Sequence, residues 1–161
     1  MFYWISGIIG ALLIAADQLS KYWAVHVLQP VGTLPAVPGI FNFTFLENGN
    51  SGGAWGIFSG KQGFLVLFSV ILMIVILYLI IAKKVTNRMA VLSLILILAG
   101  GIGNLIDRLM QGFVVDFIQF DFWQSFPIFN VADICVTVGI ILFCIYILFI
   151  EGKDKKKETA K

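Results

Sequence analysis

Residues 63–82 read GFLVLFSVILMIVILYLIIA and contain no charged side chain, and this segment indicates the fold class most clearly. A helix rises about 1.5 Å per residue, so this stretch would be about 30 Å long, which is the thickness of the hydrocarbon core of a bilayer. Residues 131–150 form a second apolar stretch of the same length, in which Asp133, near its start, is the only charged residue. Both segments are therefore predicted to be membrane-spanning helices.

Two further apolar segments, at residues 2–24 and 89–107, are also long enough to cross a membrane. Asp17 and Lys21 interrupt the first of them, and several glycines interrupt the second. The chain is therefore predicted to be a single membrane domain, residues 1–161, built as an all-α bundle of four transmembrane helices.

The composition agrees with a membrane protein, because hydrophobic residues make up 60% of the 161 residues and charged residues only 12%. Soluble domains contain about 25% charged residues, so the composition excludes a water-soluble globule. The length leaves room for a few spans and short connections, but not for a separate large soluble domain. The net charge is only +2, and no nucleic-acid partner is expected.

Basic residues are concentrated on one side of the predicted membrane. Eight of the 11 Lys and Arg residues lie between the second and third spans or after the fourth span. The positive-inside rule makes that side cytoplasmic. We therefore expect a multi-pass protein with both termini and the tail, residues 151–161, in the cytoplasm, and with outer segments at residues 29–62 and 108–130.

The first outer segment contains a pattern typical of a half-buried strand. Three phenylalanines alternate with Asn42 and Thr44 in the sequence FNFTF at residues 41–45. Asn- and Gly-rich turn residues at 48–53 follow, and then the apolar segment 54–58. We expect a small β-sheet subdomain at the outer membrane interface, with its aromatic face toward the lipid headgroups or the helices.

Asp17 and Lys21 are ionisable residues inside a predicted span, where each would cost roughly 2.5 to 3.5 kcal/mol at the bilayer centre. They are four residues apart on one helical face and can neutralise each other. One interpretation is a structural ion pair that fixes the first span against its neighbours. The other is a direct role in substrate binding.

The third span contains a glycine-rich stretch followed by a polar cluster. Residues 99–103, AGGIG, thin the helix so that another backbone or an extended substrate can approach it. Asn104, Asp107 and Arg108 follow at spacings of three and four, and therefore share one face near the outer interface. They form either a polar cluster that ends the helix or part of a catalytic site.

Two further aspartates lie in contrasting environments. Asp116 belongs to residues 112–122, GFVVDFIQFDF, predicted to be strand or irregular chain, where apolar neighbours desolvate the carboxylate and raise its pKa. Asp133 opens the fourth span, where unpaired amide groups and the helix dipole favour a carboxylate. Such a pair suits an aspartyl peptidase, in which one ionised acid activates water and one protonated acid donates to the scissile amide. The alternative is that both acids are caps at the interface.

Other catalytic chemistries lack the residues that they need. The single histidine, His26, excludes a HExxH zinc motif and leaves too few ligands for a catalytic metal. No helix is marked as presenting a serine together with a lysine or histidine base. The sequence also has no phosphate-binding glycine motif. Neither a metal nor a cofactor is expected.

Five short motifs, in this order, resemble those of lipoprotein signal peptidase, the type II signal peptidase of bacteria. They are DQLSK at 17–21, NSGGAW at 50–55, GGIGNLIDR at 100–108, VVDF at 114–117 and FNVAD at 129–133. The sequence departs from the family pattern at Gly53, where alanine is usual. The resemblance covers essentially the whole chain.

The resemblance implies that Asp116 and Asp133 form a catalytic dyad, and that Asp17 and Lys21 support the structure. It implies substrate binding or positioning of the dyad for Asn50, Gly52, Asn104, Asp107, Arg108, Asn130 and Ala132. Arg108 has two possible partners, which are the oxygens of lipid headgroups or peptide backbone on the one hand and Asp107 on the other.

The resemblance also implies the substrate, a prolipoprotein whose cysteine carries a diacylglyceryl group and which is cut on the amino side of that cysteine. It places the enzyme, as a monomer among membrane lipids, in the bacterial cytoplasmic (inner) membrane with its active site near the outer leaflet. One alternative is a small proton-coupled carrier or channel that uses the intramembrane carboxylates as a relay. Another is a non-catalytic chaperone that holds lipoprotein precursors.

Overall fold

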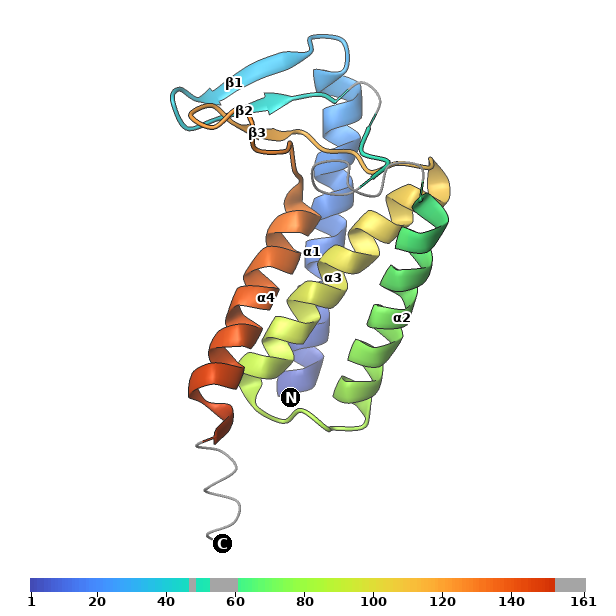
Figure 1. The fold of residues 1–161 in the computed structure, drawn as a ribbon, viewed down its shortest axis with the longest axis vertical. Helices are drawn as coiled ribbons and strands as arrows, with labels where there is room; N and C mark the ends of the chain where they lie inside the picture. The colour runs from blue at the N-terminus through green and yellow to red at the C-terminus, as the bar shows by residue number, and fades with distance from the viewer. Residues whose placement is uncertain (47–48, 53–60, 153–161) are drawn as a thin grey trace, which may run out of the picture.

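The computed structural model describes residues 1–46, 49–52 and 61–152, in which four long helices stand side by side below a small sheet (Figure 1). Each of these helices is long and apolar enough to cross a membrane. The helices are α1 (Phe2–Trp23), which continues into the π-helix η1 (Ala24–Leu28), then α2 (Gln62–Ile81), α3 (Arg88–Met110) and α4 (Val131–Phe149). The fold class predicted from the sequence is confirmed.

Two helices extend beyond the predicted spans. The helical chain of α1 and η1 reaches Leu28 rather than residue 24, and α3 ends at Met110 rather than at residue 107. Hydropathy marks only the lipid-matched part of a helix, whereas the helical hydrogen bonding continues through the polar residues beyond it. The start of α3 is capped by the Asn87 side chain, which accepts from the backbone amide of Met89 at 2.9 Å.

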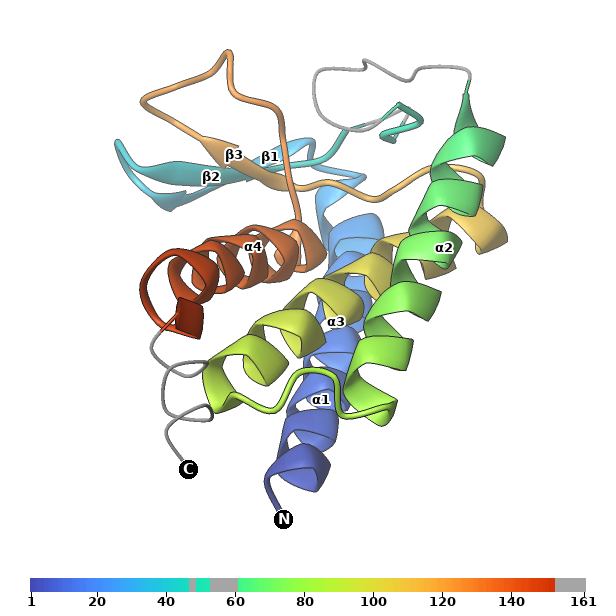
Figure 2. The same ribbon diagram turned by 60° about the horizontal axis from the view of Figure 1, so that its bottom comes forward.

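α3 is the central helix of the bundle. Half of its most apolar window is buried, against 11–17% for the other three helices, and it packs against each of them. Figure 2 shows α3 between α4 and α2, with α1 behind it. The outer faces of α2 and α4 stay exposed and apolar, as at Ile71, Tyr78 and Ile141, and these are the surfaces that lipid would cover.

Glycines bring α3 close to its neighbours. A methyl group on Gly100 would overlap the carbonyl oxygen of Ala132, and one on Gly103 would overlap the carboxylate of Asp17. A methyl group on Gly139 of α4 would likewise overlap Ser93 and Ile97 of α3. Of the two roles expected for the glycine stretch of α3, close approach of another segment is the one observed here. The space beside Gly100 and Gly103 is filled by α4 and α1 and holds no room for a substrate.

The small sheet is antiparallel, with the strand order β1 (Thr33–Val37), β2 (Phe41–Thr44) and β3 (Ile118–Phe120). Phe43 of the predicted strand pairs with Ile118 and packs its ring 5.2 Å from Trp23, between ring centroids. The aromatic face at Phe43 therefore points to the helices, where it joins an apolar cluster with the end of α1. The predicted apolar segment 54–58 lies outside the described residues.

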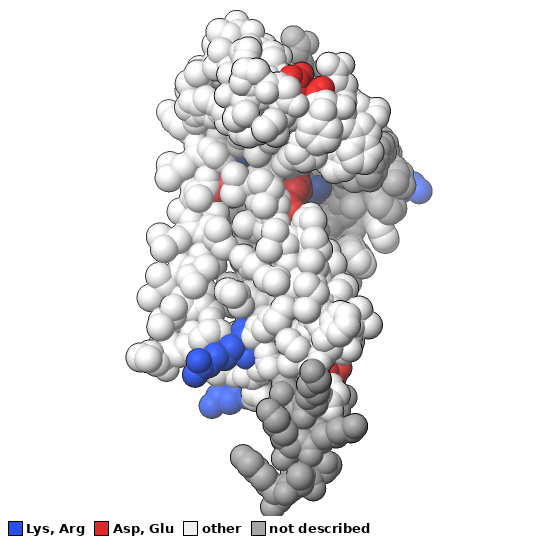
Figure 3. Space-filling view, turned by 90° about the vertical axis from the view of Figure 1, so that its left-hand side faces the viewer, with Lys and Arg blue, Asp and Glu red and all other residues white. Residues whose placement is uncertain are grey.

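The molecule has two distinct ends. Figure 1 places the N-terminus, the connection between α2 and α3 and the end of α4 at the end opposite the sheet. On the face shown in Figure 3, charged side chains gather near the two ends, while the long middle of the bundle is almost entirely uncharged. This distribution matches a bundle whose middle lies in lipid.

Candidate active site

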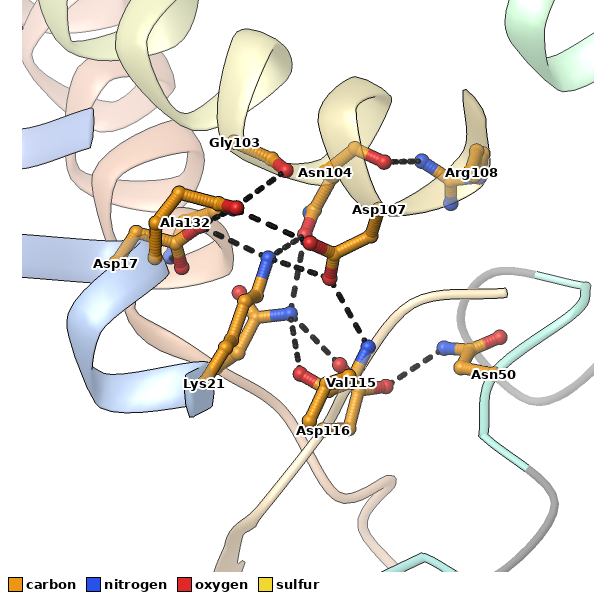
Figure 4. A network of polar contacts seen from close by, with 12 residues as sticks. Asp17, Lys21, Asn50, Gly103, Asn104, Asp107, Arg108, Val115, Asp116 and Ala132 are labelled. Carbon is orange, nitrogen blue, oxygen red and sulfur yellow. Dashed lines mark hydrogen bonds and ion pairs between the residues drawn. The ribbon is translucent and has the colours of Figure 1, made fainter. Parts of the chain in front are cut away.

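The polar residues singled out in the sequence gather at one place, where α1, α3 and the start of α4 meet just below the sheet (Figure 4). The chain between α3 and β3 crosses this place and brings Val115 and Asp116 into it. Asn50 approaches from the other side, on the segment that follows β2. The site therefore combines three helices with two extended segments.

Asp133 is fixed by the cap of α4. The Asn130 side chain accepts from the backbone amide of Asp133 at 2.9 Å, and the Asp133 carboxylate accepts from the backbone amide of Asn130 at 3.1 Å. This reciprocal capping box holds the carboxylate at the helix start. Its other oxygen, Oδ1, accepts from Nδ2 of Asn104 at 2.8 Å.

Asp116 is almost fully buried, with 2% of its surface exposed. Its two oxygens accept from two amides, Oδ1 from Nδ2 of Asn130 at 2.7 Å and Oδ2 from Nδ2 of Asn50 at 2.8 Å. Burial raises the pKa of Asp116 to about 7, and the nearby carboxylate of Asp133 adds to this rise. The bonds from the two asparagines and the charge of Lys21 oppose it.

Asn130 joins the two aspartates through a single side chain. Its Nδ2 donates to Asp116, and its Oδ1 receives the backbone amide of Asp133. Asn130 is itself fully buried, so its position is set by the surrounding fold. The side-chain amide of Asn130 thus lies between Asp116 and Asp133 and connects them.

Asn50 is oriented by its own loop. Its Oδ1 accepts from the backbone amide of Gly52 at 3.1 Å, which leaves Nδ2 to face Asp116. The backbones of Asn50 and Val114 also pair as an isolated bridge, with N–H to O distances of 2.8 and 3.0 Å. Gly53, the position where the sequence departs from the family pattern, lies outside the described residues.

Asp17 and Lys21 form the ion pair that their spacing allows, with 2.9 Å between Nζ and Oδ2. Lys21 also pairs with Asp107 at 2.9 Å, and both residues of the first pair are almost fully buried. The other oxygen of Asp17 accepts from the backbone amide of Ala132 at 2.9 Å. Asp17 thus satisfies one of the free amides in the first turn of α4.

Asp107 ties α3 to the segment that carries Asp116. Its Oδ2 accepts from the backbone amide of Val115 at 3.1 Å, besides the contact with Lys21. Among the residues that the structure describes, no ion pair joins Arg108 to Asp107, so the expected alternative of such a pair is wrong. Arg108 donates instead to the carbonyl oxygen of Asn104 at 3.3 Å, and its buried Nε has no partner in the described part of the chain.

Gln18 is a contact residue to which the sequence analysis assigned no function. Its Nε2 lies 3.1 to 3.2 Å from Asp17 Oδ2, the carbonyl oxygen of Gly103 and Asp107 Oδ1. It therefore bridges α1 and α3 next to the ion pairs. A polar residue beside two charged ones in an otherwise apolar span is the signal that points to it.

An open cavity of about 490 Å³ adjoins the two aspartates. Asp116, Asp133, Asn50, Asn104 and Arg108 form its polar wall. The rest of the wall is mainly apolar and comes from the chain before α4 and from α4 itself, at Phe120, Phe126, Pro127, Ile128, Phe129, Ile134, Val136, Thr137 and Val138. Two acids beside an open and largely apolar cavity can bind and cleave an extended apolar peptide.

The part of the chain that the structure describes, 1–46, 49–52 and 61–152, contains no group of three His, Cys, Asp or Glu residues arranged to hold a metal ion. Asp17 and Asp107 approach each other through the ammonium group of Lys21, which already supplies a positive charge between them.

A bundle of membrane-spanning helices with a buried aspartate, Asp116, and a half-buried one, Asp133, beside an open cavity defines a membrane-embedded aspartyl peptidase. The family model described as signal peptidase (SPase) II matches residues 9–149. The chain belongs to the signal peptidase II family.

Relatives support this assignment over nearly the full length. The lipoprotein signal peptidase of Lactobacillus johnsonii is 43% identical over 147 residues, which are 91% of this chain and 94% of the relative. That of Enterococcus faecalis is 41% identical over 153 residues, which are 95% of this chain and 93% of the relative.

A solved bacterial membrane enzyme is also similar, with a TM-score of 0.81 and 35% identity, over 91% of this chain and 94% of the other. The family and the curated relatives are peptidases, and the hypothesis of a carrier or channel finds no support in them. The chain is therefore a multi-pass membrane peptidase of the signal peptidase II family, with the prolipoprotein class as its substrate.

Proposed function

We propose that Asp116 and Asp133 are the catalytic dyad of this peptidase and cleave a prolipoprotein on the amino side of a diacylglyceryl-modified cysteine. The observation that carries this proposal is the joint position of both carboxylates beside one open cavity, held by Asn130. The dyad shares one proton. Its ionised member takes a proton from the attacking water while its protonated member donates one to the carbonyl oxygen. As the C–N bond breaks, the acid that took the proton from water passes it to the leaving amine, and the other acid takes a proton back from a hydroxyl of the tetrahedral intermediate.

The remaining polar residues hold the dyad or meet the substrate. Asn50, Asn104 and Asn130 orient the two carboxylates, while Gly52 and Ala132 act through their backbone amides. Asp107 holds the segment of Asp116 by binding the Val115 amide, and the Asp17–Lys21 pair supports that arrangement.

Arg108 is the cation available for substrate oxygens. Its Nε is buried beside the cavity without a partner among the described residues, and Asp107 is engaged elsewhere. Oxygens of the substrate backbone or of a lipid headgroup suit the guanidinium group equally well by charge and geometry.

The enzyme is proposed to act as a monomer in the bacterial cytoplasmic membrane, with both termini in the cytoplasm and the dyad near the outer leaflet. The site lies at the sheet end of the bundle, whereas the basic connection between α2 and α3 lies at the other end. A dyad close to a membrane surface suits a substrate that is itself anchored by lipid.

The test is a cleavage assay in detergent with a synthetic precursor peptide, prepared with and without the diacylglyceryl group. The wild-type protein should cut only the modified peptide, and mass spectrometry should show the cysteine at the new amino terminus. D116N and D133N should each lose about 10²- to 10⁴-fold in rate, because general acid–base catalysis contributes about that much.

D121N is the matched control, since Asp121 lies in the same outer segment but accepts from Gly39 and Asn42, away from the cavity wall. It should remain active. Cleavage near the wild-type rate by D116N or D133N would refute the dyad, and equal cleavage of both peptides would refute the lipid requirement.

A further inference from the structure

Lys21 makes three hydrogen-bonded contacts from a position that is 3% exposed. Its Nζ lies 2.9 Å from Asp17, 2.9 Å from Asp107 and 3.0 Å from Oδ1 of Asn104. An ammonium group has three donors, so all of them are used. The third contact is the unexpected one, because it leads away from the ion pairs and toward the dyad.

The side chain of Asn104 has a defined orientation in this network. Its Oδ1 accepts from Lys21 and from Nδ2 of Asn130, which is also 3.0 Å away. Its Nδ2 therefore faces Asp133 and donates to Oδ1 of that carboxylate at 2.8 Å. If the side-chain amide of Asn104 were flipped by half a turn, its oxygen would face the Asp133 carboxylate. Its NH2 group would then face two other donors, Nζ of Lys21 and Nδ2 of Asn130.

We propose that Lys21 is a positioning residue for the reaction, which acts through Asn104 by holding the amide with its N–H donor toward Asp133. In this orientation Asn104 supports the ionised form of Asp133, because an N–H donor stabilises a carboxylate and an oxygen would require the acid to be protonated. Lys21 touches neither the substrate cavity nor the carboxylate of Asp133.

The charged groups around the dyad come from every element that packs against it. α1 contributes Asp17 and Lys21, α3 contributes Asp107 and Arg108, and the carboxylates of Asp116 and Asp133 interact with each other. Removal of Lys21 alone would change both the net charge and the Asn104 contact. A clean test has to separate these two effects.

The charge-balanced variant D17N/K21M separates them, because it has the net charge of the wild type, and D17N/K21Q, which has the same net charge, is its reference for the donor toward Asn104. The D17N variant keeps Lys21 on Asp107 and Asn104, and the new amide oxygen can still accept from the Ala132 amide. Adding K21M removes the donor to Asn104. D17N/K21Q is the conservative rescue, because a glutamine amide restores a neutral N–H donor at this position.

Relative to the wild type, which has the same net charge, we expect D17N/K21M to lose at least about tenfold in kcat with KM changed less than about threefold, since a tenfold loss corresponds to about one hydrogen bond. The pH profile of kcat should change as well, and D17N/K21Q should regain part of the loss. Wild-type-like kcat and pH profile in D17N/K21M would overturn the proposal.

A double-mutant cycle with N104A decides whether Lys21 acts through Asn104. In the N104A background, the step from D17N/K21Q to D17N/K21M, which leaves the net charge unchanged, should have no effect on kcat. Additive losses would show a purely structural role and would overturn the proposal. Thermal unfolding in detergent identifies any variant that does not fold.

If D17N/K21M does not fold, D17N/N104D takes its place, because it has the net charge of the wild type, keeps Lys21 with an acceptor oxygen at position 104, and removes the donor that faces Asp133. A strong loss of kcat with an unchanged midpoint of unfolding is expected, and wild-type kcat would overturn the proposal. The inference rests on the proposed dyad. An active D116N rejects the dyad itself, whereas an inactive D116N with a fully active D17N/K21M rejects only the role of Lys21.

Discussion

Asn130 holds both carboxylates of the proposed dyad while it caps α4, and this dual role couples the start of a helix to the reacting groups. Asp116 and Asp133 each accept two hydrogen bonds from amides. These bonds favour ionisation, whereas burial of Asp116 opposes it. The balance leaves Asp116 able to hold a proton near neutral pH, which a shared-proton mechanism requires.

The pH dependence of cleavage follows from this balance. With the pKa of Asp116 at about 7, the dyad keeps its shared proton below that pH and loses it above. We therefore expect kcat/KM for a lipidated peptide to fall as the pH rises above about 7. The fall of kcat/KM at acidic pH reflects protonation of the two aspartates as a coupled pair, and it is expected at lower pH.

Substitution of Asn50 should shift the alkaline limb of the pH profile, which is the fall of kcat/KM above about pH 7. The N–H donor of Asn50 at 2.8 Å lowers the pKa of Asp116, so N50A should raise that pKa further. The limb should shift to higher pH by about one unit, because a hydrogen bond to a charged group is worth about 1.5 kcal/mol. A limb that stays in place or moves to lower pH would contradict the assignment of this limb to Asp116.

Stability should depend on the same group. Folding raises the pKa of Asp116 from 3.8 to about 7, so the folded protein binds more protons than the unfolded chain between these values. The contribution of Asp116 to the free energy of unfolding is therefore greatest below the unfolded pKa and is lost as the pH rises through about 7, by up to about 4 kcal/mol.

D116N removes this titration and should flatten the pH dependence of the unfolding midpoint in detergent. Asparagine also places one N–H group against the donors of Asn50 or Asn130, but that penalty is the same at every pH. The difference between variant and wild type should thus favour the variant more at pH 8 than at pH 5. Equal differences at the two values would argue against a raised pKa.

Sequence reasoning predicted which acids belong to the site, but not how they are connected. Asp116 and Asp133 are marked by apolar neighbours and by a helix start, and these are local properties of the chain. The contact from Lys21 to Asn104 spans 83 positions, so it depends on how α1 packs against α3. The choice between the two partners open to Arg108 could not be made from the sequence for the same reason, since it depends on Lys21 from another helix, which occupies Asp107.

At the scale of the elements, α3 positions the site because its glycines allow α1 and α4 to come close. Gly103 faces both the Asp17 carboxylate and the Ala132 side chain. This close approach allows Asp17 to reach the Ala132 amide and so to orient the first turn of α4. The start of α4 carries Asp133, so the glycine face of α3 acts on the dyad through packing.

G103A should therefore disrupt the site, and G101A is the matched control on the same helix. A methyl group at Gly103 would overlap Asp17, whereas one at Gly101 would meet only Met73, at an ordinary 3.7 Å. Overpacking typically costs about 1 to 3 kcal/mol. G103A should unfold at a clearly lower temperature and lose activity, while G101A should retain both properties.

If G101A were less stable and less active than G103A, the close approach of α1 and α4 to α3 would not be needed for the site. G100A provides a second comparison, because its methyl group would overlap the Ala132 carbonyl oxygen and push α4 away without touching Asp17. It should resemble G103A in activity.

The lengths of α2 and α4 were predictable, whereas the ends of the first and third helices and the strand pairing were not. The predicted span 63–82 agrees with α2, Gln62–Ile81, because the hydrocarbon core sets the length of an apolar helix. The alternation at residues 41–45 indicated β2, but its partner β3 lies more than 70 residues further along the chain. Pairing over such a distance depends on the packing of the helices between the two strands, which the local pattern does not contain.

At the scale of the whole molecule, the two ends of the bundle differ in charge and in function. The proposed dyad lies near the sheet, while the connection between α2 and α3 carries Lys83 and Lys84 at the other end. At that end Arg88 also lies over the ring of Phe2, 5.7 Å from its centroid, which joins α3 to the start of α1. The bundle is therefore polarised along its long axis, as an enzyme with a fixed orientation in the membrane requires.

This polarity predicts which residues a membrane-impermeant thiol reagent can reach in spheroplasts. Ser125 is exposed in the chain before α4, and Thr86 is exposed in the connection between α2 and α3. In a background in which Cys135 and Cys144 are replaced by alanine, S125C should react in intact spheroplasts. T86C should react only after the membrane is permeabilised, because the orientation proposed from the positive-inside rule puts the basic connection in the cytoplasm. Reaction of T86C in intact spheroplasts, with protection of S125C, would reverse the orientation and place the dyad on the side from which exported precursors are absent.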